Sequence, residues 1–212
     1  MNSENLETIK HKKILITGAA KRIGRKIAIE LASNGAQIGI HYNNSEKYAN
    51  DLRDEIVEEY GVKAWTFQQN FSGDKIEYKF IDRVIDEMEG LDVLVNNASI
   101  FPRSSLKEMT KEELLQNIDI NTWSPFVLSR RFAEKIDKGQ IINLLDTRIS
   151  GFSSNAVPYL LSKKMLDTLT KLMALEFAPV IRVNGIAPGL ILPPPGEGEE
   201  YLENLVDRVP LK

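Results

Sequence analysis

Six short apolar segments rich in β-branched residues recur along the chain, and longer, more polar segments separate them. They are residues 12–18, 36–42, 62–68, 91–97, 140–146 and 181–187. Each has the length of a strand that is buried on both faces, because such strands read as continuous apolar runs rather than as alternations. The chain must therefore bury several strands between other layers.

The intervening segments predict helices. Residues 22–35 and 45–61 carry apolar side chains at the 3.6-residue period of a helix, and both segments end at a glycine. Ser45 stands at the N-cap position of the second segment. Strands that alternate with helices predict an α/β fold, a Rossmann-like doubly wound parallel sheet with helices on both faces.

Composition limits what such a fold can do. The 212 residues contain no linker-like stretch between periodic segments, so we expect a single domain over 1–212, with 1–11 as a flexible N-terminus. A net charge of -3 without a basic stripe gives no reason to expect nucleic acid as a partner. Cysteine is absent and His11 and His41 are the only histidines, so we expect no metal site. No run of about 18 apolar residues occurs, and we expect a cytoplasmic protein without a membrane span.

The first strand runs directly into a glycine turn. Gly18 follows the strand and Gly24 opens the next helix, an arrangement in which backbone N–H groups and a helix N-terminus bind phosphate. Lys21 and Arg22 add positive charge to the same turn. The spacing is GxxxRxG rather than GxGxxG, and a tight turn needs glycine for conformational reasons as well.

The end of the second strand favours NADP over NAD. An NAD site places an acidic residue there to bind the ribose, whereas this chain has Asn43, Asn44 and Ser45. These neutral groups, together with Arg22, suit a 2′-phosphate. The alternative is that the two asparagines only form a turn.

A tyrosine and a lysine lie four residues apart in a later helical segment. Tyr159 and Lys163 follow Pro158, which suits the first turn of a helix, so both side chains lie on one face. A nearby ammonium group lowers the pKa of a phenol and makes it usable as an acid or base near neutral pH. Alone, the pair is also an ordinary feature of an amphipathic helix.

Taken together and in order, these motifs resemble the short-chain dehydrogenase/reductase family. The segments are TGAAKRIG, LVNNAS, Asn121 in IDINTWSPFVLS, YLLSK and IRVNGIAPG, which cover residues 12 to about 210. The resemblance implies that Tyr159 donates a proton, that Lys163 lowers the pKa of this phenol and holds the nicotinamide ribose, and that Asn121 supports a proton relay through water. It implies NADP contacts from Gly18, Lys21, Arg22, Ile23, Gly24, Tyr42, Asn43, Asn44, Ser45, Asn70, Phe71, Asn97, Ala98, Ser99, Lys163, Pro188 and Gly189.

One position departs from the family pattern. The end of the fifth strand, where the family usually has serine, is Asp146, with Thr147 as an alternative one residue later. An aspartate at this position, together with Arg22 in the glycine turn and the pair Ser99 and Phe101, makes the chain resemble pteridine reductases and dihydromonapterin reductases. The resemblance implies an NADPH-dependent reduction of dihydrobiopterin, dihydromonapterin or dihydrofolate. Substrate contacts would come from Arg22, Ser99, Phe101, Asp146 and Tyr159.

The aspartate fits that chemistry. A carboxylate repels the alkoxide that forms when a ketone is reduced, but it suits a ring rich in N–H groups, and it could pass a proton through Tyr159. Phe101 would stack on the pterin. The simpler alternatives are that Phe101 closes a hydrophobic wall and that Asp146 caps the next turn. At the level of function, the alternatives are a 3-oxoacyl or carbonyl reductase and a catalytically silent NADP-binding protein.

The C-terminal part raises further expectations. Asn70 stands where the family usually offers an acidic residue to adenine, and residues 188–204 are expected to form a substrate loop. The family pattern continues beyond Lys212 into a helix and a last strand, so we expect either that the sequence is truncated or that the sheet ends one strand early with an exposed edge. Apolar faces at 111–136 and 158–177 suit a homodimer or homotetramer, or else only cover the sheet.

Overall fold

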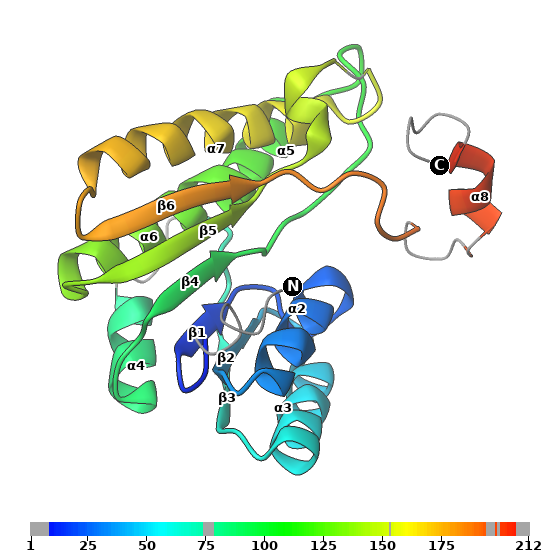
Figure 1. Ribbon diagram of the computed structural model, residues 1–212. Helices are drawn as coiled ribbons and strands as arrows, with labels where there is room; N and C mark the ends of the chain where they lie inside the picture. Colours follow the sequence, from blue (N-terminus) through cyan, green and yellow to red (C-terminus); the bar gives the residue numbers. More distant parts are fainter. Residues whose placement is uncertain (1–8, 74–78, 153, 194–197, 199, 207–212) are drawn as a thin grey trace.

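The computed structural model describes residues 9–73, 79–152, 154–193, 198 and 200–206. These residues form a parallel sheet of six strands in the order β3-β2-β1-β4-β5-β6 (Figure 1). The strands are β1 (Lys13–Ile16), β2 (Gln37–Tyr42), β3 (Ala64–Gln68), β4 (Val93–Asn96), β5 (Gly139–Leu144) and β6 (Ile181–Ile186). Every neighbouring pair is parallel. The predicted fold class is confirmed.

Helices cover both faces of the sheet. The helices of the described residues are α2 (Arg22–Ser33), α3 (Glu46–Tyr60), α4 (Lys79–Met88), α5 (Lys111–Ile118), α6 (Ser124–Lys135), α7 (Val157–Glu176) and α8 (Glu200–Val206), with a π-helical turn η1 (Asp119–Trp123) and a 3-10 turn η2 (Thr147–Ser150). Helix α8 lies away from the sheet (Figure 1). One core cluster joins α4, α6 and α7 to the sheet through residues such as Phe80, Phe132 and Met173. A second cluster joins α2 and α3 to the opposite face through residues such as Ala28 and Leu52.

The element boundaries differ locally from the sequence prediction. The helical segment predicted at 111–136 is divided by the π-helical turn that contains Asn121. Ser45 does occupy the N-cap of α3, but its side chain makes no capping hydrogen bond. Gly61 ends α3 in the left-handed conformation, with φ 65°. The preceding helix α2 has Asn34 as its C-cap, and Gly35 follows it in the left-handed conformation with φ 86°, so this helix closes on the predicted glycine.

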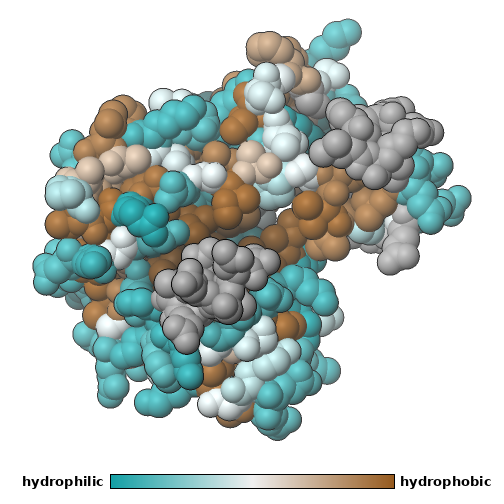
Figure 2. All heavy atoms as spheres, viewed as in Figure 1, coloured by the Kyte–Doolittle hydropathy of each residue, from teal (hydrophilic) through white to brown (hydrophobic). Residues whose placement is uncertain are grey.

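The outer strand β6 has an exposed surface. Arg182, Asn184 and Ile186 alternate with or follow buried residues, and Ile186 is 50% exposed. Figure 2 shows apolar side chains over this region and along the segment that leads toward α8. In the part of the chain that the structure describes, no strand pairs with the free edge of β6. None of the described helices is long and apolar enough to cross a membrane.

Candidate active site

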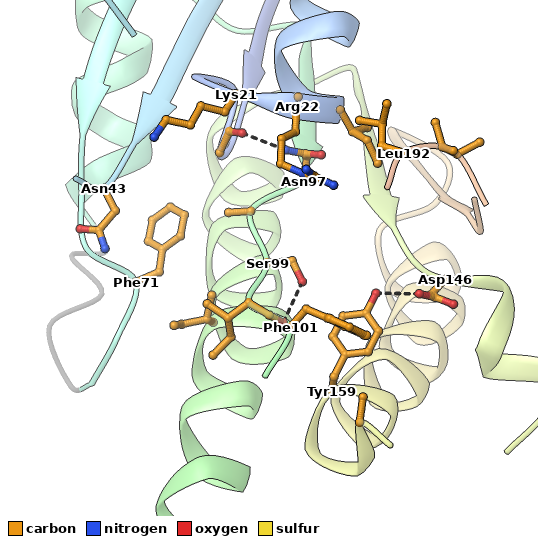
Figure 3. Close-up of a pocket in the computed structure, with 18 of the residues that line it drawn as sticks. Lys21, Arg22, Asn43, Phe71, Asn97, Ser99, Phe101, Asp146, Tyr159 and Leu192 are labelled. Carbon is orange, nitrogen blue, oxygen red and sulfur yellow. Dashed lines mark hydrogen bonds between the residues drawn. The ribbon is translucent and has the colours of Figure 1, made fainter. Parts of the chain in front are cut away.

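A cavity of about 970 Å³ opens at the carboxyl ends of the central strands (Figure 3). Most of the residues predicted to bind cofactor or substrate line it: Gly18, Lys21, Arg22, Ile23, Gly24, Asn43, Asn70, Phe71, Asn97, Ala98, Ser99, Phe101, Asp146, Tyr159 and Gly189. Six predicted residues do not line it: Tyr42, Asn44, Ser45, Asn121, Lys163 and Pro188. The residues that line the cavity come from both halves of the sheet.

The glycine turn packs tightly against the end of β4. Gly18 has φ 63°, and a Cβ atom there would lie 2.9 Å from the Cα of Ala98. The hydroxyl of Thr17 accepts hydrogen bonds from the backbone N–H groups of Asn97 and Ala98, at 2.9 and 3.0 Å. The Asn97 amide donates to the carbonyl oxygens of Thr17 and Gly18. A side chain in place of Gly18 would therefore push the two strand ends apart.

His41 supports the same turn from below, a role that sequence reasoning missed. Its Nδ1 accepts a hydrogen bond from the backbone N–H of Gly18 at 3.0 Å, and its Nε2 lies 3.0 Å from the carbonyl oxygen of Gln69. The ring stacks on Phe71 at 4.2 Å. Burial lowers the pKa of His41 to about 4, so the imidazole is neutral, with its proton on Nε2. The available signal was a histidine near the end of an otherwise apolar strand.

The two basic residues of the turn point in different directions. The Lys21 ammonium lies 3.9 Å from the centre of the Tyr48 ring. Arg22 has φ 55°, and its guanidinium donates a hydrogen bond of 2.8 Å to the carbonyl oxygen of Pro193. This contact joins the glycine turn to the segment predicted as a substrate loop. Part of that loop, 194–197 and 199, lies outside the described residues.

Asp146 meets Tyr159 at the other end of the cavity. Its Oδ2 accepts a hydrogen bond of 2.8 Å from the Tyr159 hydroxyl, while its Oδ1 accepts one of 2.8 Å from the backbone N–H of Arg148. The carboxyl group therefore caps the turn η2 and contacts the phenol at the same time, so the two alternatives from the sequence hold together. Thr147, the alternative register, does not line the cavity.

The electrostatics of Tyr159 differ from the prediction. Burial raises the pKa of its phenol, and the negative charge and hydrogen bond of Asp146 raise that pKa further. Lys163 does not counteract this effect, because its Nζ lies 5.8 Å from the centre of the Tyr159 ring and donates to the carbonyl oxygen of Leu144 at 2.7 Å. Burial lowers the pKa of Lys163 to about 8. The predicted lowering of the Tyr159 pKa is thus wrong for the protein without ligands.

Asn121 holds the loop after β4 rather than facing the cavity. Its side-chain oxygen accepts hydrogen bonds from the Ile100 backbone N–H and the Ser99 hydroxyl, at 2.9 and 3.1 Å. Its amide donates to the Ile100 carbonyl oxygen and the Ser162 hydroxyl, both at 3.0 Å. The buried side chain is fully used by the protein. A relay through water from this side chain does not fit these contacts.

Phe101 forms the wall beside the tyrosine. It is 43% exposed, and its ring meets Tyr159 edge to face at 4.6 Å. The guanidinium of Arg148 lies 5.0 Å from the centre of the Phe101 ring. Arg103 also lines the cavity. Sequence reasoning missed both arginines, although each follows a predicted site residue by two positions.

The cavity thus has two chemically different ends. One end offers the backbone of a glycine turn, the N-terminus of α2 and the neutral Asn43. The other offers a buried phenol hydrogen-bonded to a carboxyl group beside an exposed aromatic ring. Such a site can hold a phosphate-bearing ligand and transfer a proton to a second, flat molecule.

Comparison with known sequences finds one family over most of the chain. The family model for short chain dehydrogenases matches residues 12–199. General stress protein 39 of Bacillus subtilis is 31% identical over 192 residues, which is 89% of this chain and 66% of that protein. The 3-oxoacyl-[acyl-carrier-protein] reductase FabG of Staphylococcus epidermidis is 32% identical over 211 residues, which is 95% of this chain and 85% of that protein.

Comparison with solved structures agrees. FolM Alternative dihydrofolate reductase 1 from Brucella canis, complexed with NADP, superposes with a TM-score of 0.89 at 29% identity, over 96% of this chain and 81% of that one. The acetoin dehydrogenase YohF from Salmonella typhimurium superposes with a TM-score of 0.80 at 29% identity, over 90% and 77% of the two chains. With its parallel sheet and its order of motifs, the chain belongs to the short-chain dehydrogenase/reductase family.

Proposed function

We propose that the protein is an NADPH-dependent reductase of a dihydropteridine ring. The observation that carries this proposal is the hydrogen bond of 2.8 Å between Tyr159 and Asp146 on the wall of the cavity. A carboxyl group paired with the proton-donating phenol suits a substrate that needs a proton on nitrogen. The likeness to FolM Alternative dihydrofolate reductase 1 supports the same substrate class.

The residues of the glycine-turn end fit NADP. Gly24 lets the start of α2 pack closely on the turn, since a Cβ atom there would lie 2.6 Å from the Gly18 carbonyl oxygen, and such a turn can present backbone N–H groups to a phosphate. Asn43 lines the cavity at the end of β2, and among the described lining residues Asp146 alone carries a carboxyl group. Lys21 and Arg22 would then hold the 2′-phosphate. When bound, NADPH supplies the hydride.

The protein's own residues supply the proton. The raised pKa keeps Tyr159 a phenol, so a free phenolate is an unfavourable state next to Asp146. As Tyr159 gives its proton to a ring nitrogen, a proton from water would reach the phenol by way of the Asp146 carboxylate, which is hydrogen-bonded to the hydroxyl. The side chain of Asp146 is 20% exposed, so water can reach it. Phe101 provides a flat surface for the ring.

The second candidate is a 3-oxoacyl or carbonyl reductase. The identity of 32% to FabG over 95% of this chain favours it. The Asp146 carboxylate opposes it, because negative charge beside a forming alkoxide destabilises the transition state. Purified protein should oxidise NADPH with dihydrobiopterin, dihydromonapterin or dihydrofolate, as followed by the loss of NADPH absorbance. Turnover of a 3-oxoacyl thioester without turnover of any pterin would contradict the proposal.

Substitution of Asp146 by serine separates the two candidates. Serine keeps the cap of η2 and a hydrogen-bond partner for Tyr159, but it removes the carboxyl group. We expect kcat/KM for the pterin to fall about 30-fold, because one proton-transfer group is lost. Activity on a simple ketone should rise. An unchanged pterin activity would remove Asp146 from the reaction, and NADPH binding without turnover in the wild type would favour a silent binding protein.

We also propose a homodimer or homotetramer. An apolar groove between α5, η1, α6 and α7 is lined by Ile118, Trp123, Phe126, Leu161 and Met165. Trp123 and Met165 are 48% and 43% exposed. A second copy of the chain would cover these side chains. Sedimentation of the wild type and of Trp123→Glu, which should dissociate, tests the assembly.

A further inference from the structure

Two arginines at the Phe101 end of the cavity are not explained by the proton relay. Arg103 and Arg148 both line the cavity, on segments that follow β4 and β5. The Arg148 guanidinium lies over Phe101 at 5.0 Å, and its Nε is 3.9 Å from the Oδ1 of Asp146. The side chain of Arg148 is 46% exposed. The guanidinium is therefore accessible to a ligand in the cavity.

The donors of both side chains are available to a ligand. Within the described residues, no hydrogen bond occupies the guanidinium of Arg148, and Arg103 has neither a hydrogen bond nor an ion pair. A guanidinium presents five N–H donors in a planar fork, a geometry that matches the oxygens of a carboxylate or phosphate. Two such groups lining one cavity can bind an anionic group.

The charge of the cavity points the same way. Its described lining carries Lys21, Arg22, Arg103 and Arg148 against the single acidic residue Asp146, although the whole chain has a net charge of -3. Lys21 and Arg22 belong to the glycine turn, which the proposed function assigns to the cofactor. The positive charge at the Phe101 end therefore remains for the substrate.

We propose that Arg103 and Arg148 bind an anionic group on the tail of the substrate, a carboxylate or a phosphate held beyond the reducible ring. This inference rests on the proposed function and narrows it to ring systems with an acidic tail. Dihydrofolate, whose tail ends in carboxylates, belongs to this class. Dihydrobiopterin and dihydromonapterin, whose tails are neutral, do not, and they would offer neither guanidinium group an anionic partner.

The test compares kcat/KM for dihydrofolate with that for dihydrobiopterin. We expect the wild type to prefer dihydrofolate, and Arg148→Met and Arg103→Met each to reduce that preference about 10-fold through KM. The preference should also weaken as salt is added. Dihydroneopterin monophosphate separates a phosphate-binding site from a carboxylate-binding one. Arg53→Met, which removes the same charge from a partly exposed position on α3 outside the cavity, is the matched control.

Failure of the anion-binding inference and failure of the proposed pteridine reductase function give different results. Both pterins could be turned over with the same ratio of kcat/KM for dihydrofolate to that for dihydrobiopterin in the wild type and the two arginine variants. That result overturns the inference and leaves the proposed function in place. If ketones are reduced and pterins are not, the function fails, and 3-oxobutanoate against its ethyl ester tests the arginines in the same way. If nothing is turned over, equilibrium binding of the two pterins to the NADP-loaded protein decides, and equal affinities overturn the inference.

Discussion

The two ends of the cavity are built by different means. At the glycine-turn end the structure depends on the backbone and on small or fully bonded groups: Gly18, Thr17, Asn97 and the neutral His41. At the tyrosine end it depends on larger side chains that remain partly accessible, such as Phe101 and Arg148.

The contrast between the two ends explains how one fold can accept many substrates. A backbone cradle tolerates few changes, because an added Cβ atom collides with the neighbouring strand end. The opposite end uses side chains on two segments after β4 and β5, which can be exchanged without moving the sheet. If the two ends are separable, a change at one end should leave the other end unaffected.

Tyr159→Phe should abolish proton transfer at the tyrosine end of the cavity and leave NADPH binding at the glycine-turn end intact. The change removes only the hydroxyl that donates to Asp146. We expect kcat to fall about 1,000-fold, since a positioned proton donor is lost. NADPH affinity, measured by fluorescence titration, should stay within about threefold of the wild type, because phosphate contacts dominate it. A variant that keeps a tenth of the activity would show that another group donates the proton.

Acid should weaken the glycine-turn end through His41. Its folded pKa of about 4 lies below the ordinary value of 6.5. The unfolded chain therefore binds the proton first, and stability falls as the pH drops from 6.5 to 4 and is level below that. This group should cost about 3 kcal/mol of unfolding free energy over that interval. Urea unfolding of the wild type and His41→Gln measures it, and parallel pH curves for the two would contradict the assignment.

Gly18→Ala should reduce NADPH affinity by more than the left-handed φ of this residue alone would explain. Gly18 and Gly61 have nearly the same φ, 63° and 65°, but a Cβ atom at Gly61 would meet nothing within 4 Å. We expect NADPH affinity to fall about 30-fold in Gly18→Ala, because Ala98 must move, and not in Gly61→Ala. Calorimetric titration of both variants checks this, and equal affinities would show that the turn can relax.

Activity should fall in alkaline solution through Lys163. Burial brings the pKa of its ammonium to about 8. In the proposed function the charged form would hold the nicotinamide ribose. As the pH rises above 8 the charge is lost, and kcat/KM for NADPH should fall about tenfold by one unit beyond the pKa. A pH profile measures the effect. A level profile up to pH 10 would mean that the neutral amine suffices.

Much of the fold followed from the sequence because its signals are local. Each of the six apolar runs became a strand, and the glycine turn lies where the run 12–18 predicted it. The π-helical turn at Asp119–Trp123 was not predictable, because its cause is the tertiary contact of Asn121 with Ile100 and Ser162. Helical periodicity alone continues through that segment.

The site was predicted less completely. The pairing of Asp146 with Tyr159 was anticipated, but the direction of the Tyr159 pKa was not, because spacing on a helix says nothing of burial. Arg148 was missed since its position over Phe101 depends on the course of η2. The roles of the cavity residues in binding and catalysis remain predictions for the experiments above.

The shared carboxyl group of Asp146 has a consequence for how this protein can change. One oxygen fixes the start of η2 and the other meets the phenol, so the group cannot rotate toward one partner without leaving the other. Insertions or exchanges in residues 147–150 should alter the reaction even where they touch no ligand. A change in the shape of this turn therefore also changes the hydrogen bond between Asp146 and the phenol.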